Sequence, residues 1–200
     1  MPIQGKYIQL EPLSFSHFDS LKQAADVGRI WNYMPQIATA PFFQKWFDER
    51  IEKMQKKVEI TYVVRDIHEK HLVGCVGIHD LSFEHKRLTL SCWYNPKAWG
   101  TSANHEALLL IMREAFEVWK MNRVELGTDP RNLQSLNVIK KLGATEEGYL
   151  RSHMIHHNGL VTDTLLFSIL STEWDRVKYR LENRINKLGE RRSKKRSVML

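Results

Sequence analysis

A turn of small polar residues, Trp99 to Asn104, separates a run of strand-forming residues, Leu88 to Tyr94, from a long apolar segment. Between a strand and a buried helix, such a turn exposes backbone N–H groups beside the positive end of the helix dipole. An anion such as a pyrophosphate can bind there. The turn matches neither the P-loop nor the Gly-x-Gly-x-x-Gly dinucleotide motif. Spacing alone favours a simple helix cap.

A second pair of polar residues, Asn132 and Ser135, falls one helical turn apart near the start of a predicted helix over 130–142. Asp129 is the expected N-cap of that helix, because proline follows it at the first helical position. The pair lies away from the apolar stripe of the helix. Without further information, the favoured interpretation is that both are ordinary solvent-facing polar residues.

Several ionisable side chains are candidates for a general base near a central cleft, and the sequence does not choose among them. They are His79, Glu84, Glu125, His153, His156 and His157. The histidine pairs at 68/71 and 156/157 lack a supporting cysteine pair, because Cys75 and Cys92 fall on separate predicted strands. We therefore expect no metal site.

The elements that position these residues follow the order β-α-α-βββ-α-β-α-ββ-α. The predicted elements are a short strand ending at residue 12, helices at 14–25 and 43–54, strands at 60–64, 72–78 and 87–94, a helix at 108–119, a strand at 124–128, a helix at 130–142, two strands flanking Asn158-Gly159, and a closing helix from residue 171. Short connections among the three middle strands indicate an antiparallel meander. One α/β (α+β) domain is predicted.

The composition is that of an ordinary globular domain. Of 200 residues, 42% are hydrophobic and 26% are charged, which excludes wholesale disorder and collagen-like or coiled-coil chains. Two cysteines cannot build a disulfide framework, and no apolar run approaches the ~18–20 residues that span a bilayer. The first residues also lack a signal-peptide core. The sequence predicts a soluble, cytoplasmic protein without a membrane partner.

The basic charge is concentrated at the end of the chain. The formal net charge is +7, and residues 187–200 hold six Lys or Arg against one Glu, so the rest carries only +2. We therefore expect a nearly neutral domain over 5–186 and a basic, flexible tail over 187–200. The tail is either a solvated end or a contact for RNA or the ribosome.

An ordered run of short motifs resembles the acyl-CoA core of the GNAT superfamily, closest to its RimJ/RimL-like (ribosomal-protein N-acetyltransferase) branch. The likeness covers about residues 5–180. The matching motifs are Trp99-Gly100-Thr101-Ser102-Ala103-Asn104-His105-Glu106-Ala107, Asn122-Arg123-Val124, Thr128-Asp129-x-x-Asn132-x-x-Ser135, Lys141-Leu142-Gly143-Ala144, Glu146-Glu147-Gly148 and Glu173-Trp174.

One departure concerns the loop that holds the pyrophosphate in this superfamily, usually Gln/Arg-x-x-Gly-x-Gly/Ala. Here Trp99 takes the first place, Ser102 the central glycine and Asn104 the last. Serine and asparagine are mild replacements, because both cap helices and asparagine tolerates left-handed geometry. In a subset of RimJ/RimL-like proteins, the pyrophosphate loop resembles this one.

The resemblance implies a GNAT fold, a mixed and mostly antiparallel sheet whose parallel strands, Arg87–Tyr94 and Arg123–Thr128, splay apart. Acetyl-CoA would lie in the splay as co-substrate. Its phosphates would contact the N–H groups of Trp99, Gly100, Thr101, Ser102, Ala103 and Asn104, and its pantetheine would follow strand residues Cys92, Trp93 and Tyr94. Asn132 would bind the pantetheine arm, while Cys92 would remain a core residue.

The activity implied is N-acetyl transfer by direct attack of an amine on the thioester, with Ser135 assisting departure of the thiolate. The acceptor stays open among a protein N-terminus, a polyamine, an antibiotic and another small amine, and a homodimer is an open alternative. Two other functions also remain open. One is a GNAT-fold module that binds acyl-CoA or regulates without efficient catalysis, and the other is a ribosome- or nucleic-acid-associated protein.

Overall fold

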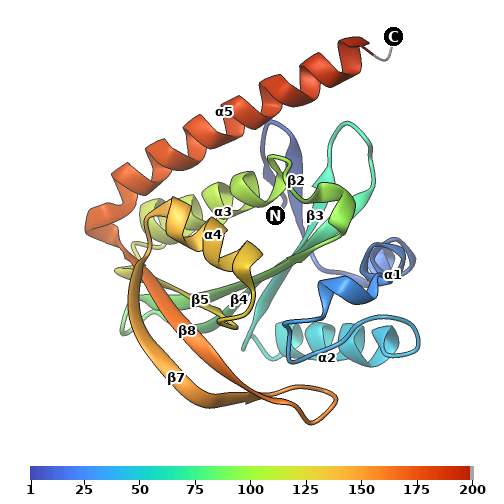
Figure 1. The fold of residues 1–200 in the computed structure, drawn as a ribbon, viewed down its shortest axis with the longest axis vertical. Coiled ribbons are helices and arrows are strands. Elements are labelled where there is room, and N and C mark those ends of the chain that lie inside the picture. Colours follow the sequence, from blue (N-terminus) through green and yellow to red (C-terminus); the bar gives the residue numbers. More distant parts are fainter. Residues whose placement is uncertain (199–200) are drawn as a thin grey trace.

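An eight-stranded sheet with helices on both faces organises the chain (Figure 1). The computed structural model describes the backbone of residues 1–198 and the side chains of residues 1–191. The strands lie in the order β1-β2-β3-β4-β5-β6-β8-β7. They are β1 (Ile3–Gln4), β2 (Ile8–Pro12), β3 (Ile60–Asp66), β4 (Leu72–Ser82), β5 (Arg87–Tyr94), β6 (Arg123–Thr128), β7 (Thr145–Ile155) and β8 (Val161–Leu170).

The described residues form five α-helices in two layers. They are α1 (Phe18–Ala25), α2 (Phe43–Gln55), α3 (Ala103–Arg113), α4 (Leu133–Leu142) and α5 (Trp174–Val198). The last three share one apolar core with the sheet, whereas α1 and α2 close a second core on the opposite face. In Figure 1, α5 is the long red helix that runs past α3. No described helix is long and apolar enough to cross a membrane.

The two cores follow from the pleat of the central strands, whose successive side chains point to opposite faces. On β3, Val64 packs with the α3 side and Val63 with the α2 side. On β5, Leu90 joins the first core and Trp93 the second. Such strands are buried on both faces, which explains their continuous apolar runs.

Among the described strands, β5 and β6 form the only parallel pair, and they are paired over just part of their length. The ladder runs from Arg87 opposite Arg123 to Leu90 opposite Leu126. Beyond that point β5 continues through residues 91–94 without β6, whereas the other edge of β6 stays paired with β8 from Arg123 to Thr128. The predicted fold class, a mostly antiparallel mixed sheet with splayed parallel strands, is confirmed.

Helix α4 starts later than the sequence predicts. The expected N-cap was Asp129, but the helix begins at Leu133 and its cap is Asn132, whose side chain accepts the Ser135 amide at 3.0 Å. Asp129 instead accepts hydrogen bonds from the backbone and the guanidinium of Arg131. The helix ends as predicted, with Gly143 in the left-handed region at φ 87°.

Helices α3 and α5 both extend beyond their predicted limits. Helix α3 begins at Ala103, five residues before the expected start, and a π-helical turn follows it over Glu114–Val118. Helix α5 continues without a break past residue 187, where the basic tail was expected to begin. Leu188 is 7% exposed and packs against the body of the protein. The apolar stripe of α5 therefore reaches into the basic segment.

Candidate active site

The loop between β5 and α3 is held in shape by its own hydrogen bonds. The Thr101 hydroxyl donates to the Ala98 carbonyl at 2.7 Å and accepts from the Ala103 amide at 3.3 Å. Gly100 adopts a left-handed conformation with φ 73°, which a side chain would disfavour. The turn is thus built before any ligand arrives.

The first turn of α3 presents unpaired backbone amides beside this loop. Its ladder begins with the Glu106 amide donating to the Ser102 carbonyl at 2.9 Å, so the amides of Asn104 and His105 precede the ladder and are available to an anion. Ser102 has right-handed geometry, with φ −72° and 3% exposure. Position 102 therefore does not require the glycine of the superfamily pattern for its backbone conformation.

Trp99 fixes the entrance of the loop and brings a cation to it. Its indole N–H donates to the Tyr94 carbonyl at 2.9 Å. The guanidinium of Arg29 lies 5.1 Å from the centroid of the Trp99 ring and is exposed. Arg29 comes from a 3₁₀ turn 70 residues earlier, and no local pattern in the sequence links it to this loop. It adds a positive charge beside the candidate phosphate site.

The unpaired end of β5 is joined to α3 through Cys92. The Cys92 thiol donates to the Asn104 side-chain oxygen at 3.8 Å. Burial raises the pKa of Cys92 to about 12, so the thiol stays protonated and is a poor nucleophile. The Trp93 side chain leaves the splay and packs on Trp31 and Trp46 in the second core, so only its backbone faces the splay.

Asn132 and Ser135 stand at the start of the neighbouring helix. Because β5 and β6 are parallel, their carboxyl ends meet at one edge of the sheet, and α3 and α4 both begin after that edge. The Asn132 oxygen is used in capping, which leaves its amide NH₂ for a ligand. The half-buried Ser135 hydroxyl makes no hydrogen bond within the described side chains.

The structure separates the general-base candidates. Glu84 lies in the turn before β5, and the strand from Arg87 to Ser91 puts about 13 Å between the end of that turn and the splay. Glu125 is engaged by Arg123 at 2.7 Å. The imidazoles of His153 and His156 are hydrogen-bonded to threonine hydroxyls of their own hairpin, and His157 is tied to the Pro35 carbonyl through its backbone amide. His79, by contrast, hydrogen-bonds Ser91, the first β5 residue beyond the β6 ladder.

Comparison with known proteins decides the family. A family model described as the acetyltransferase (GNAT) domain matches residues 8–145, well over half of the chain. The chain belongs to this family. This GNAT protein is thus an acetyltransferase, and the resemblance stated from its motifs is confirmed.

Relatives of this acetyltransferase match nearly its full length. The Bacillus subtilis protein named "Probable N-acetyltransferase YjcK" is 28% identical over 178 residues, covering 86% of this chain and 98% of the relative. A GCN5-related N-acetyltransferase from Brucella melitensis superposes with a TM-score of 0.83 at 25% identity, covering 92% of this chain and 84% of the other. Mycobacterium smegmatis RimJ, solved with CoA-disulfide, shares the fold at a TM-score of 0.76, 17% identity and 88% coverage of each chain.

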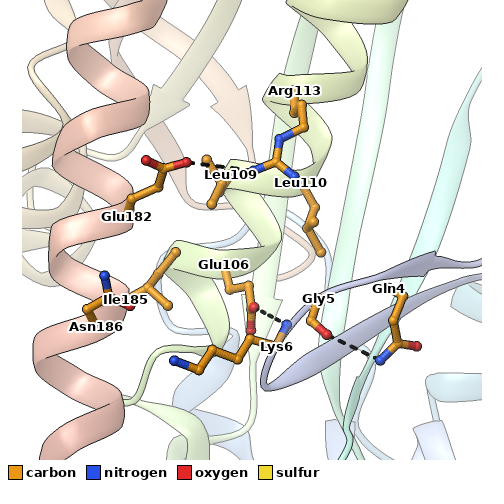
Figure 2. A pocket seen from close by; sticks show the side chains of 10 residues that line it. All are labelled: Gln4, Gly5, Lys6, Glu106, Leu109, Leu110, Arg113, Glu182, Ile185 and Asn186. Atoms are coloured by element: carbon orange, nitrogen blue, oxygen red, sulfur yellow. Dashed lines mark hydrogen bonds and ion pairs between the residues drawn. The ribbon is translucent and has the colours of Figure 1, made fainter.

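A cavity of about 350 Å³ in the acetyltransferase lies away from the site residues named from sequence, none of which lines it (Figure 2). It is bounded by the β1–β2 turn, α3 and α5. Glu106 forms one wall, and its carboxylate accepts the amides of Lys6, Tyr7 and Ile8 at 2.5, 2.9 and 3.1 Å. Glu106 therefore anchors the first hairpin to α3, a role the motif did not reveal. Among the described residues no group of side chains is arranged to hold a metal.

Proposed function

We propose that this acetyltransferase moves an acetyl group from acetyl-CoA to a primary amine, on a protein N-terminus or a small molecule, by direct transfer. The observation that carries the proposal is the opening between β5 and β6 after Leu90 and Leu126, which leaves residues 91–94 without a paired strand on that side in the described part of the chain. An extended pantetheine can bind to such a strand edge much as a peptide does.

The phosphates of acetyl-CoA fit the start of α3. The amides of Asn104 and His105 are free for an anion, and the helix dipole and Arg29 both favour negative charge there. Gly100 supplies the left-handed residue that such a loop needs. Ser102 is only 3% exposed, so we infer that its replacement of a glycine does not obstruct the ligand. These features favour a functional acyl-CoA site over a module that has lost it.

The chemistry follows from the groups around the splay. Backbone N–H groups near Cys92 and Tyr94 polarise the thioester carbonyl, which the amine attacks. The tetrahedral intermediate collapses by breaking the carbon–sulfur bond, and the Ser135 hydroxyl stabilises the departing thiolate. No covalent acyl-enzyme is required, which agrees with a protonated Cys92.

Two measurements test this function together. Binding of acetyl-CoA to the folded protein should raise its melting temperature in proportion to the logarithm of the ligand concentration above Kd. A panel of amines, including peptides with free N-termini, should then release free CoA. Absence of both a thermal shift at millimolar acetyl-CoA and CoA release with every amine would overturn the proposal.

A further inference from the structure

Three polar side chains on the α2 side of the sheet form a chain of contacts from the interior to the splay. Glu59 precedes β3, His79 lies on β4 and Ser91 on β5. His79 Nδ1 lies 3.2 Å from Glu59 Oε2, and its Nε2 is hydrogen-bonded to the Ser91 hydroxyl. Glu59 is 4% exposed, whereas Ser91 is exposed. The order carboxylate, imidazole and hydroxyl is one that moves protons in other enzymes.

The carboxylate at the inner end is held ionised. Arg50 donates to both Glu59 oxygens at 2.9 and 2.8 Å, Thr61 donates at 2.8 Å, and Lys53 lies 3.7 Å away. Burial by itself would raise the pKa of Glu59, but the His79 hydrogen bond and the Arg50 charge hold it at about 2. An ionised carboxylate can only accept. Neutral His79 must therefore carry its proton on Nδ1, leaving Nε2 to accept from Ser91.

A glycine makes room for the contact between His79 and Ser91. Gly77 pairs with Ser91 across the β4–β5 ladder and points to the same face as His79. A Cβ at Gly77 would lie 2.9 Å from His79 Nε2 and 3.0 Å from Ser91 Oγ. Any larger residue would press the two groups apart, so the sequence at this position suits the contact.

Ser91 stands where the acceptor amine must arrive. It is the first β5 residue after the last β5–β6 pair, Leu90 and Leu126, and it adjoins Cys92, whose backbone belongs to the group proposed above to polarise the thioester. We propose that Ser91 and His79 relay the proton of the incoming ammonium group, and that Glu59 is a positioning residue which fixes the His79 tautomer. This inference rests on the proposed function, because it assigns the base of that reaction.

Every proton that the amine loses has an acceptor in this relay. The ammonium group gives a proton to the Ser91 oxygen while the Ser91 hydroxyl proton passes to His79 Nε2, leaving a neutral amine and an imidazolium beside Glu59. The amine then forms the nitrogen–carbon bond, the carbon–sulfur bond breaks, and the second nitrogen proton passes to the thiolate through Ser135. The half-buried His79 returns its proton to solvent.

Kinetics of three variants test the relay. His79→Gln, Ser91→Ala and Gly77→Ala should each lower kcat by about 10²-fold with an ordinary alkylamine, while acetyl-CoA affinity changes less than about twofold. With a weakly basic amine that is already neutral at the assay pH, the loss should shrink to about threefold or less. A structural role would lower both rates equally. The matched controls are His85→Gln, in the β4–β5 turn, and Gly28→Ala, where nothing lies within 4 Å of the added Cβ.

The outcomes separate the relay from the proposed function. A wild-type enzyme that releases no CoA overturns the proposed function and the relay with it. An active wild type with unchanged kcat in His79→Gln, or with an equal loss for both amines, overturns the relay alone. An acetyl group found on Ser91 by mass spectrometry after exposure to acetyl-CoA also overturns it, in favour of a covalent intermediate.

Nitrogen-15 NMR of the imidazole tests the contact without turnover. In the unliganded wild type, neutral His79 should be protonated on Nδ1, with Nε2 shifted as a hydrogen-bond acceptor. Gly77→Ala should remove the acceptor shift of Nε2. A neutral His79 protonated on Nε2 contradicts the relay, whatever the activity.

Discussion

The side-chain oxygen of Asn132 accepts a hydrogen bond from the backbone amide of Ser135 at 3.0 Å, which ties two expected site residues together. This hydrogen bond caps α4, and within the described residues the Asn132 NH₂ and the Ser135 hydroxyl make no other hydrogen bond. The cap therefore gives Asn132 a structural role that can be separated from any contact with acetyl-CoA.

Two substitutions of Asn132 should separate the cap from the contact. Asn132→Ala removes the cap and should lower the free energy of unfolding by about 1 kcal/mol. Asn132→Asp keeps an acceptor for the Ser135 amide but lacks the NH₂ donor, so it should retain stability and weaken acetyl-CoA binding. Urea unfolding and calorimetric titration measure the two effects. Unchanged affinity in the Asp variant would leave Asn132 as a cap only.

Ser135→Ala should lower turnover more than acetyl-CoA binding, because its hydroxyl interacts most strongly with the charge that develops on sulfur in the transition state. We expect kcat to fall about 10²-fold and stability to change by less than about 0.5 kcal/mol. Steady-state kinetics with a direct binding measurement check this. Exposed Gln134→Ala is the control on the same turn. Weaker binding with normal kcat would make Ser135 a pantetheine contact instead.

Asn104→Asp should change stability and binding in opposite directions. A negative charge in the first turn of α3 stabilises the free protein by about 0.3–1 kcal/mol, and the aspartate still accepts from the Cys92 thiol. The same charge repels the phosphates, so acetyl-CoA affinity should fall at least about tenfold, less at high salt. Asn104 suits this test better than Ser102, whose burial would turn an added charge into a folding defect.

Calorimetric titration at two salt concentrations measures this effect. Asn137→Asp is the matched control, because it adds the same charge at an exposed position in the middle of α4. An acetyl-CoA affinity in Asn104→Asp equal to that of the control would place the phosphates elsewhere.

His105 should make the protein less stable in mild acid. Burial, followed by the charge of Arg184, lowers the pKa of His105 from 6.5 to about 4. Because the folded-state pKa is the lower one, its contribution to stability is complete above pH 6.5 and is lost as the pH falls toward 4. Between pH 7 and 5, wild type should therefore lose about 1–2 kcal/mol relative to His105→Gln.

Urea unfolding of both proteins at pH 7, 6 and 5 measures the difference, with exposed His85→Gln as the control. A constant gap between wild type and His105→Gln across this range would show that His105 is not held neutral by the fold.

Truncation of α5 should locate the end of the packed domain. A chain ending at Glu190 keeps Leu188, whereas a chain ending at Asn186 loses the buried Leu188 side chain. We expect the shorter chain to unfold about 1–2 kcal/mol more easily, from the apolar area returned to water. The chain ending at Glu190 should have the same free energy of unfolding as the full-length protein. Equal stability of the two truncated proteins would place the boundary at residue 187.

Local signals determined much of this fold from the sequence alone. Gly143 ends α4 in the left-handed region, and Gly159, with φ 81°, turns the β7–β8 hairpin as Asn158-Gly159 predicts. Such features depend on the φ preferences and hydrogen bonds of a few consecutive residues. Each family motif within 99–148 is likewise a short run of neighbouring residues, which is why these motifs indicated the fold and the candidate site. The cap of α4 was misplaced because both Asp129 and Asn132 are good capping residues.

Tertiary structure alone decided which distant side chains meet. Arg29 lies on Trp99, Glu106 binds the amides of the first hairpin, and Glu59, just before β3, aligns with His79 on β4 and Ser91 on β5. The sequence offered His79 only as one of six equal candidates for a base. Strand register singled out His79 among these candidates. Because Gly77 pairs with Ser91, the His79 imidazole reaches the Ser91 hydroxyl, and a register slip of one residue would turn one of the two side chains to the other face of the sheet.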